Sequence, residues 1–125
     1  MATRRILIVE DSPAMRQLLL LAVRRFADVE VEEVGDGVAA LRALAQGPFR
    51  VVFVDLNMPI LDGMKLIKRI REDARYKGTR IIVVTTEERE EVEAQALELG
   101  ADHYLQKPVN RRSVEKVLQE ALGGD

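Results

Sequence analysis

The amino-acid sequence predicts an α/β fold in which a parallel sheet is covered by helices on both faces. Short apolar runs, rich in β-branched residues, alternate with segments of helical length, and this alternation repeats five times along the 125 residues. Strictly alternating strands and helices are typical of parallel strands joined by right-handed crossovers. We therefore expect one domain over residues 1–125, with no linker and no effector domain.

Five segments are predicted to be strands. Three are continuous apolar runs, which suit strands buried on both faces, at residues 6–9, 51–54 and 81–84. Residues 29–34 alternate only in part, which favours an edge strand whose charges face water. Residues 103–107 are the fifth candidate.

Helices are predicted between these strands from capping residues. Ser12 is a candidate N-cap, and Pro13 stands at the first helical position, where its missing N–H costs nothing. The Asp-Gly pair that starts at Asp62 is typical of the start of another helix, with Asp62 as its cap. The expected helices cover residues 12–26, 36–46, 87–99 and 110–122, with a further one that begins at Asp62.

Composition argues against several classes of protein. There is no cysteine, which excludes disulfides and thiolate metal sites, and the single histidine, His103, argues against a histidine-rich metal site. Lys and Arg number 19 against 21 Asp and Glu, so no basic excess favours nucleic acid. The first apolar run ends at Glu10 and is too short for a signal peptide or a membrane span. We expect a cytoplasmic protein that binds neither nucleic acid nor membranes.

Polar side chains stand where the predicted strands end. Glu10 and Asp11 follow the first strand, Asp55 follows the third, and Thr85 and Lys107 end the fourth and fifth. Ligands of such sheets bind at the carboxyl ends of the strands, so we expect these side chains to converge. An all-oxygen ligand set suits Mg²⁺, and a lysine beside it suits a transferring phosphoryl group. Asp55 is the best candidate nucleophile, because it ends the central strand.

These motifs resemble those of a response regulator receiver domain of the CheY-like superfamily. The resemblance extends over the whole chain, and its specificity comes from the order and spacing of several modest motifs. It implies a flavodoxin-like (βα)5 fold with strand order 2-1-3-4-5. The matching segments are Glu10-Asp11-Ser12 and residues 54–59, 61–63, 84–86 and 100–108.

The resemblance also implies a role for each residue of the site. Asp55 would accept a phosphoryl group from a histidine kinase or a histidine phosphotransfer protein, and Lys107 would contact a phosphoryl oxygen. Asp11, Asp55 and the backbone carbonyl of Asn57 would bind Mg²⁺, with Mn²⁺ as a possible substitute. Glu10 would act on the metal ion through water.

Further positions take their roles from the same resemblance. Thr85 and Tyr104 would form a switch that changes partner binding after phosphorylation, and Pro108 would follow a cis peptide bond. Asn57 and Glu87 would tune the lifetime of the phosphorylated form. Polar side chains at both positions predict rapid self-dephosphorylation.

Charge is distributed unevenly over the predicted helices. The segment 87–99 carries six glutamates against one arginine, which is typical of a solvated face but also suits a docking surface. The resemblance implies a downstream protein target on the surface of the fourth helix, fifth strand and fifth helix, and a monomer or a weak phosphorylation-dependent dimer. Arg16, Arg24 and Arg25 predict a basic face on the first helix, near the site, and the resemblance implies that this face would receive a kinase or a phosphotransfer domain.

Three other functions fit the sequence less well. A Mg²⁺-dependent phosphatase with an aspartyl nucleophile usually has a second acid two residues later, where this chain has Asn57. A flavodoxin-type electron carrier would place the FMN phosphate against Glu10 and Asp11, which would repel it. A phosphorylation-independent scaffold would have no use for an intact acidic site. We expect no enzymatic activity beyond phosphotransfer to Asp55 and hydrolysis of the phosphorylated Asp55.

Overall fold

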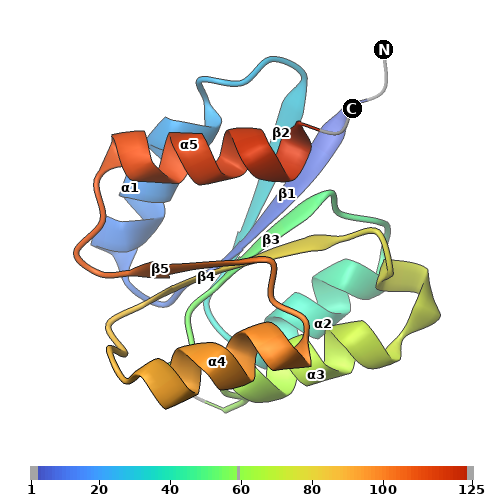
Figure 1. The fold of residues 1–125 in the computed structure, drawn as a ribbon. Helices are drawn as coiled ribbons and strands as arrows, with labels where there is room; N and C mark the ends of the chain where they lie inside the picture. Colours follow the sequence, from blue (N-terminus) through green and yellow to red (C-terminus); the bar gives the residue numbers. More distant parts are fainter. Residues whose placement is uncertain (1–2, 59, 124–125) are drawn as a thin grey trace.

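A five-stranded parallel sheet lies between two layers of helices in the computed structural model, which describes residues 3–58 and 60–123 (Figure 1). The strand order is β2-β1-β3-β4-β5, and every pair of neighbours is parallel. The predicted flavodoxin-like α/β fold is therefore confirmed. Within the described residues, no helix has the length and apolar character needed to cross a membrane.

The elements alternate as the sequence predicts. The strands are β1 (Arg4–Val9), β2 (Val29–Val34), β3 (Val51–Val54), β4 (Arg80–Thr85) and β5 (His103–Gln106). The helices are α1 (Pro13–Val23), α2 (Gly37–Ala45), α3 (Gly63–Glu72), α4 (Glu90–Leu99) and α5 (Arg111–Leu122). A short 3-10 helix, η1 (Ala74–Tyr76), precedes β4 and is not predicted by the sequence pattern.

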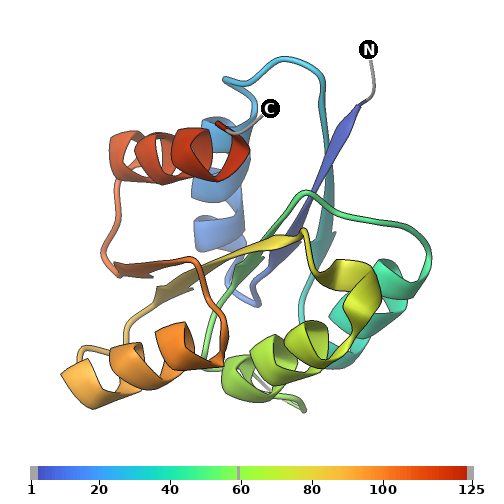
Figure 2. The same cartoon turned by 45° about the vertical axis from the view of Figure 1, so that its right-hand side comes forward.

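Two apolar cores hold the layers together. Helices α1 and α5 cover one face of the sheet, and α2, α3 and α4 cover the other, as the two views in Figures 1 and 2 show. Ile6 and Ile8 pack into the α1–α5 core, whereas Leu7 and Val9 pack into the other. This division follows from the two-residue period of a strand, which sends successive side chains to opposite faces. It explains why β1 is a continuous apolar run.

Side-chain caps begin four of the five α-helices. Each cap accepts a hydrogen bond from the backbone N–H three residues further on, which satisfies one of the free donors of the first turn. The four caps are Ser12, Asp36, Asp62 and Asn110.

The first helix is shorter than predicted. It ends at Val23 rather than near Phe26, so that part of the prediction is wrong. The backbone N–H groups of Arg25 and Phe26 bond three residues back, to the carbonyls of Ala22 and Val23, as in a tightened last turn. Asp28 then takes a left-handed conformation, with φ of 58°, and turns the chain into β2.

The fourth helix starts later than predicted, at Glu90 rather than Glu87. The Glu87 carboxylate accepts hydrogen bonds from the backbone N–H groups of Glu88 and Arg89, both at 3.1 Å. The Glu87 N–H itself donates to the side-chain oxygen of Thr85 at 3.3 Å. These local bonds hold residues 87–89 in a turn, and Arg89 keeps an extended conformation, with ψ of 129°, immediately before α4.

Candidate functional site

The site lies at the edge of the sheet where the strands end. Val9 of β1 pairs in register with Val54 of β3, so the next residues, Glu10 and Asp55, are side by side. The Asp55 N–H continues this ladder with a hydrogen bond to the Val9 carbonyl at 3.3 Å. Lys107 arrives from the end of β5, where its N–H donates to the carbonyl of β4 residue Thr85 at 2.6 Å. Parallel pairing thus brings three distant segments together.

Three carboxylates form the centre of the site. One oxygen from each of Glu10, Asp11 and Asp55 lies within 4.8 Å of the others. Glu10 and Asp55 are buried, with 1% and 5% of their surfaces exposed, whereas Asp11 is exposed. Buried like charges at this distance repel, so the cluster needs positive charge close by.

Lys107 supplies part of that positive charge. Its Nζ lies 3.0 Å from Oδ2 of Asp55 and 3.1 Å from Oε2 of Glu10, and so bridges the two buried carboxylates. Burial by itself lowers the pKa of Lys107, but the hydrogen bonds and charges of Asp55 and Glu10 outweigh it and leave that pKa above its ordinary value. The ammonium therefore stays charged at neutral pH.

Burial raises the pKa of Glu10 above its ordinary value. The negative charge of Asp55 adds to this rise, while the hydrogen bond from the Ser12 N–H and the contact with Lys107 oppose it. The Ser12 N–H lies 3.1 Å from Oε1 of Glu10. Burial thus disfavours the charged form of Glu10, and a nearby cation would stabilise that form.

A backbone N–H and the Lys107 side chain fix the orientation of Asp55. Its Oδ1 accepts a hydrogen bond from the Asn57 N–H at 3.0 Å, and its Oδ2 faces Lys107. The Asn57 side chain is exposed, and its amide nitrogen donates to Oγ1 of Thr86 at 3.4 Å. The Asn57 N–H and the Lys107 ammonium therefore hold both oxygens of Asp55, so this carboxylate is preorganised at the carboxyl-terminal edge of the sheet.

Gly63 allows α3 to approach the site. A Cβ at this position would collide with the carbonyl oxygen of Asp55 and would lie 2.6 Å from Cα of Leu56. The Gly63 N–H donates to the Leu56 carbonyl at 3.1 Å, and Asp62 caps the helix. In the sequence this Asp-Gly pair indicates only turn chemistry, and the close approach becomes visible only in the tertiary packing.

Thr85 and Tyr104 lie on either side of the loop that follows β4. Thr85 is fully buried, and its hydroxyl accepts the Glu87 N–H. The Tyr104 hydroxyl donates to the Glu87 carbonyl at 3.2 Å, and burial, followed by the charge of Glu87, raises the pKa of Tyr104. Hydrogen bonds to Glu87 in this loop thus connect Thr85 and Tyr104, the two predicted switch residues.

Glu87 itself is held by its own loop. Its carboxylate lies 2.8 Å from a guanidinium nitrogen of Arg89, and the Arg89 hydrogen bonds lower the pKa of Glu87 to about 2.

The peptide bond between Lys107 and Pro108 is cis.

The sequence matches the family described as Response regulator receiver domain over residues 6–119. The chain belongs to this family. Chemotaxis protein CheY1 of Helicobacter pylori is 33% identical over 120 residues, which cover 95% of this chain and 97% of that protein. A chemotaxis protein CheY homolog of Campylobacter jejuni is 32% identical and covers 95% of this chain and 92% of its own.

Solved structures show the same likeness. Chemotaxis protein CheY4 of Vibrio cholerae superposes with a TM-score of 0.86 at 34% identity, covering 96% of this chain and 99% of its own. The Mn²⁺-bound form of response regulator Rcp1 superposes with a TM-score of 0.81 at 30% identity, covering 94% and 90%. This chain is therefore a CheY-like receiver domain of phosphorelay signalling, a class that is not enzymatic in the ordinary sense.

The donor set of this receiver fits a divalent cation. Glu10, Asp11 and Asp55 offer only hard oxygen atoms, which lie within 4.8 Å of one another. The Asn57 carbonyl belongs to the same loop as Asp55. These residues would hold the ion at the exposed side of the cluster, where Asp11 lies.

The basic face predicted for the first helix is only partly at the site. Arg16 lies in the first turns of α1, next to Ser12 and the acidic cluster, because the helix starts at this edge of the sheet. Arg24 and Arg25 come after the 11 residues of α1. At the usual helical rise they therefore lie about 16 Å along the helix axis from its first residue. The prediction of a basic face near the site is therefore wrong for Arg24 and Arg25.

Proposed function

We propose that this receiver accepts a phosphoryl group on Asp55 in a Mg²⁺-dependent reaction. The observation that carries the proposal is the environment of the Asp55 carboxylate, which is buried, bonded to the Asn57 N–H and to Lys107, and adjacent to Glu10 and Asp11. A carboxylate fixed in this way is an oriented nucleophile, with fixed positive groups for the charge that develops on the transferred group.

The donor is the phosphohistidine of a histidine kinase or of a histidine phosphotransfer protein. An Asp55 oxygen forms a bond to phosphorus as the bond between phosphorus and the histidine nitrogen breaks, and the nitrogen keeps the electron pair and becomes a neutral imidazole after any proton exchange. Lys107 contacts a phosphoryl oxygen in place of Oδ2 of Asp55. Asp11, Asp55 and the Asn57 carbonyl would hold Mg²⁺, with Glu10 acting through water, and the ion would supply positive charge for the phosphoryl oxygens. Mn²⁺ serves as a substitute.

Phosphorylation would be transmitted through Thr85 and Tyr104. The new dianionic group attracts the Thr85 hydroxyl, which now accepts the Glu87 N–H. Loss of the Thr85–Glu87 hydrogen bond would release the loop that contains Glu87, whose carbonyl accepts a hydrogen bond from the Tyr104 hydroxyl. The affected surface comprises α4, β5 and α5, where a downstream protein would bind. Asn57 and Glu87 would set how fast water removes the phosphoryl group.

The test is phosphorylation of the purified chain by acetyl phosphate with Mg²⁺, followed by intact-mass measurement. We expect one phosphoryl group on the wild type and none on Asp55→Asn, with beryllofluoride plus Mg²⁺ binding only the wild type. Glu72→Gln, which changes an exposed carboxylate at the end of α3, is the matched control and should behave as wild type. Absence of the adduct on the wild type, or an undiminished adduct on Asp55→Asn, would refute the proposal.

A further inference from the structure

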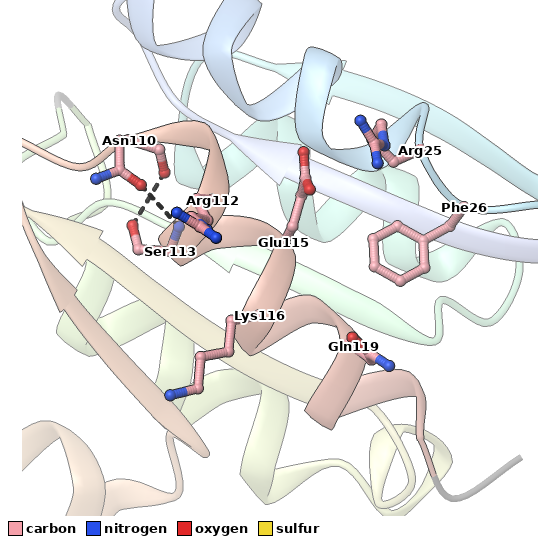
Figure 3. Close-up of a pocket in the computed structure, with 8 residues that line it drawn as sticks. All are labelled: Arg25, Phe26, Asn110, Arg112, Ser113, Glu115, Lys116 and Gln119. Atoms are coloured by element: carbon pink, nitrogen blue, oxygen red, sulfur yellow. Dashed lines mark hydrogen bonds between the residues drawn. The ribbon is translucent and has the colours of Figure 1, made fainter.

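A basic groove lies along α5, beside the turn that follows α1, and has a volume of about 730 Å³ (Figure 3). Arg25 comes from the turn after α1, and Arg112 and Lys116 come from α5. Among the described residues, these three side chains have no hydrogen-bond or ion-pair partner. Figure 3 shows the ring of Phe26 beside Arg25, on the α1 side of the groove.

The charge of this groove is not neutralised locally. Glu115 is the single acid among the described residues that line it, and its Oε2 lies 3.1 Å from Nε of Arg111. Three unpaired cations around a half-buried aromatic ring form a surface suited to an acidic segment with an apolar side chain.

An acidic surface with an exposed apolar side chain lies on the opposite layer of the same molecule. Glu90, Glu93, Ala94 and Leu97 line a shallow hollow of about 310 Å³ on α4. Their spacing places them on one helix face. All four are exposed, and Leu97 keeps 42% of its surface accessible.

We propose that the groove between α1 and α5 binds the α4 surface of a second copy of this chain. Leu97 packs against Phe26, and Glu90 and Glu93 face Arg112 and Lys116. The arguments are charge complementarity and an exposed apolar residue on one side matched by an aromatic ring on the other. The proposal does not depend on phosphorylation of the site.

The arrangement of the layers decides the form of this association. The groove lies on the α1–α5 layer and the acidic surface on the layer of α2, α3 and α4, so one molecule cannot join them internally (Figure 2). Each contact leaves a free groove at one end and a free acidic surface at the other. Such head-to-tail contacts produce open chains rather than a closed dimer. The small, charged contact also predicts weak binding that salt disrupts.

Sedimentation equilibrium of two half-defective variants tests the proposal. Arg112→Ala/Lys116→Ala removes the groove cations, and Glu90→Gln/Glu93→Gln neutralises the α4 surface. Each variant alone should associate at least about tenfold more weakly than wild type, because two charge pairs are lost. An equimolar mixture should form a one-to-one dimer that does not grow, since only one intact contact remains available. Wild type should form longer species over about 10 μM to 1 mM at low salt.

Matched controls remove the same charges elsewhere. Lys68→Ala/Arg69→Ala on α3 and Glu30→Gln/Glu33→Gln on β2 alter exposed residues and should associate as wild type does. A monomeric wild type at low salt would overturn the proposal, as would a mixture that stays monomeric or controls that lose association equally. A monomeric wild type whose groove binds a glutamate-rich peptide, with binding lost in the groove variant, would also overturn it and assign the groove to another protein.

Discussion

Replacement of Lys107 by methionine is the sharpest test of the electrostatics of the site. The ammonium lies 3.0 and 3.1 Å from two buried carboxylates, Asp55 and Glu10, so its removal leaves both without their shared cation. Breaking a buried ion pair by removing one partner costs about 3–5 kcal/mol. Because Lys107 retains some exposure, we expect the free energy of unfolding at pH 7 to fall by about 3 kcal/mol, the lower end of that range.

The loss should depend on pH in a defined direction. Burial already raises the folded-state pKa of Glu10 above its unfolded value, and loss of Lys107 raises it further. A carboxyl group of this kind binds its proton more tightly when folded, so its protonation favours folding below the unfolded pKa, and this advantage is lost as pH rises through the folded pKa. The difference between Lys107→Met and wild type should therefore shrink as pH falls from 7 towards about 4.5.

Urea unfolding followed by circular dichroism, at several pH values with and without Mg²⁺, provides the measurement. Lys68→Met, an exposed lysine on α3, is the control and should change stability by less than about 0.5 kcal/mol. Mg²⁺ should stabilise Lys107→Met more than wild type, since the ion replaces the missing charge at the same carboxylates. A loss below about 1 kcal/mol that is independent of pH would show that Lys107 does not neutralise this cluster.

Three further predictions concern neighbouring groups. Gly63→Ala should lower the free energy of unfolding in urea by about 2 kcal/mol or more, because the added Cβ meets the β3–α3 backbone, whereas Gly78→Ala, in open space, should have little effect. Mg²⁺ affinity measured by calorimetry should fall as pH decreases through the raised pKa of Glu10, and Glu10→Gln should remove this part of the pH dependence. Phenol absorbance should show Tyr104, identified by its loss in Tyr104→Phe, ionising at higher pH than a free tyrosine; ionisation at the ordinary pH would contradict the buried bond to Glu87.

Much of the fold can be read from local pattern. The apolar runs of β1, β3 and β4 are continuous because these strands are covered on both faces, and β2 alternates in part because it lies at an edge. The family resemblance adds the strand order, which local pattern alone does not determine. The helix ends are less predictable, since hydrogen bonds of the Glu87 side chain hold residues 87–89 in a turn and α4 begins only at Glu90.

The sequence by itself determined which residues stand at the ends of the strands, and hence the chemical character of the site. Glu10 and Asp55 are identified from their positions after apolar runs, and Lys107 from the end of the fifth predicted strand. Only the tertiary structure decided that one ammonium bridges Asp55, 52 residues away in the chain, and the still more distant Glu10, and that a Cβ at position 63 has no room. The physical reason is range: side-chain periodicity and capping act within a few residues, whereas charge pairing and close packing depend on where parallel strands bring distant segments together.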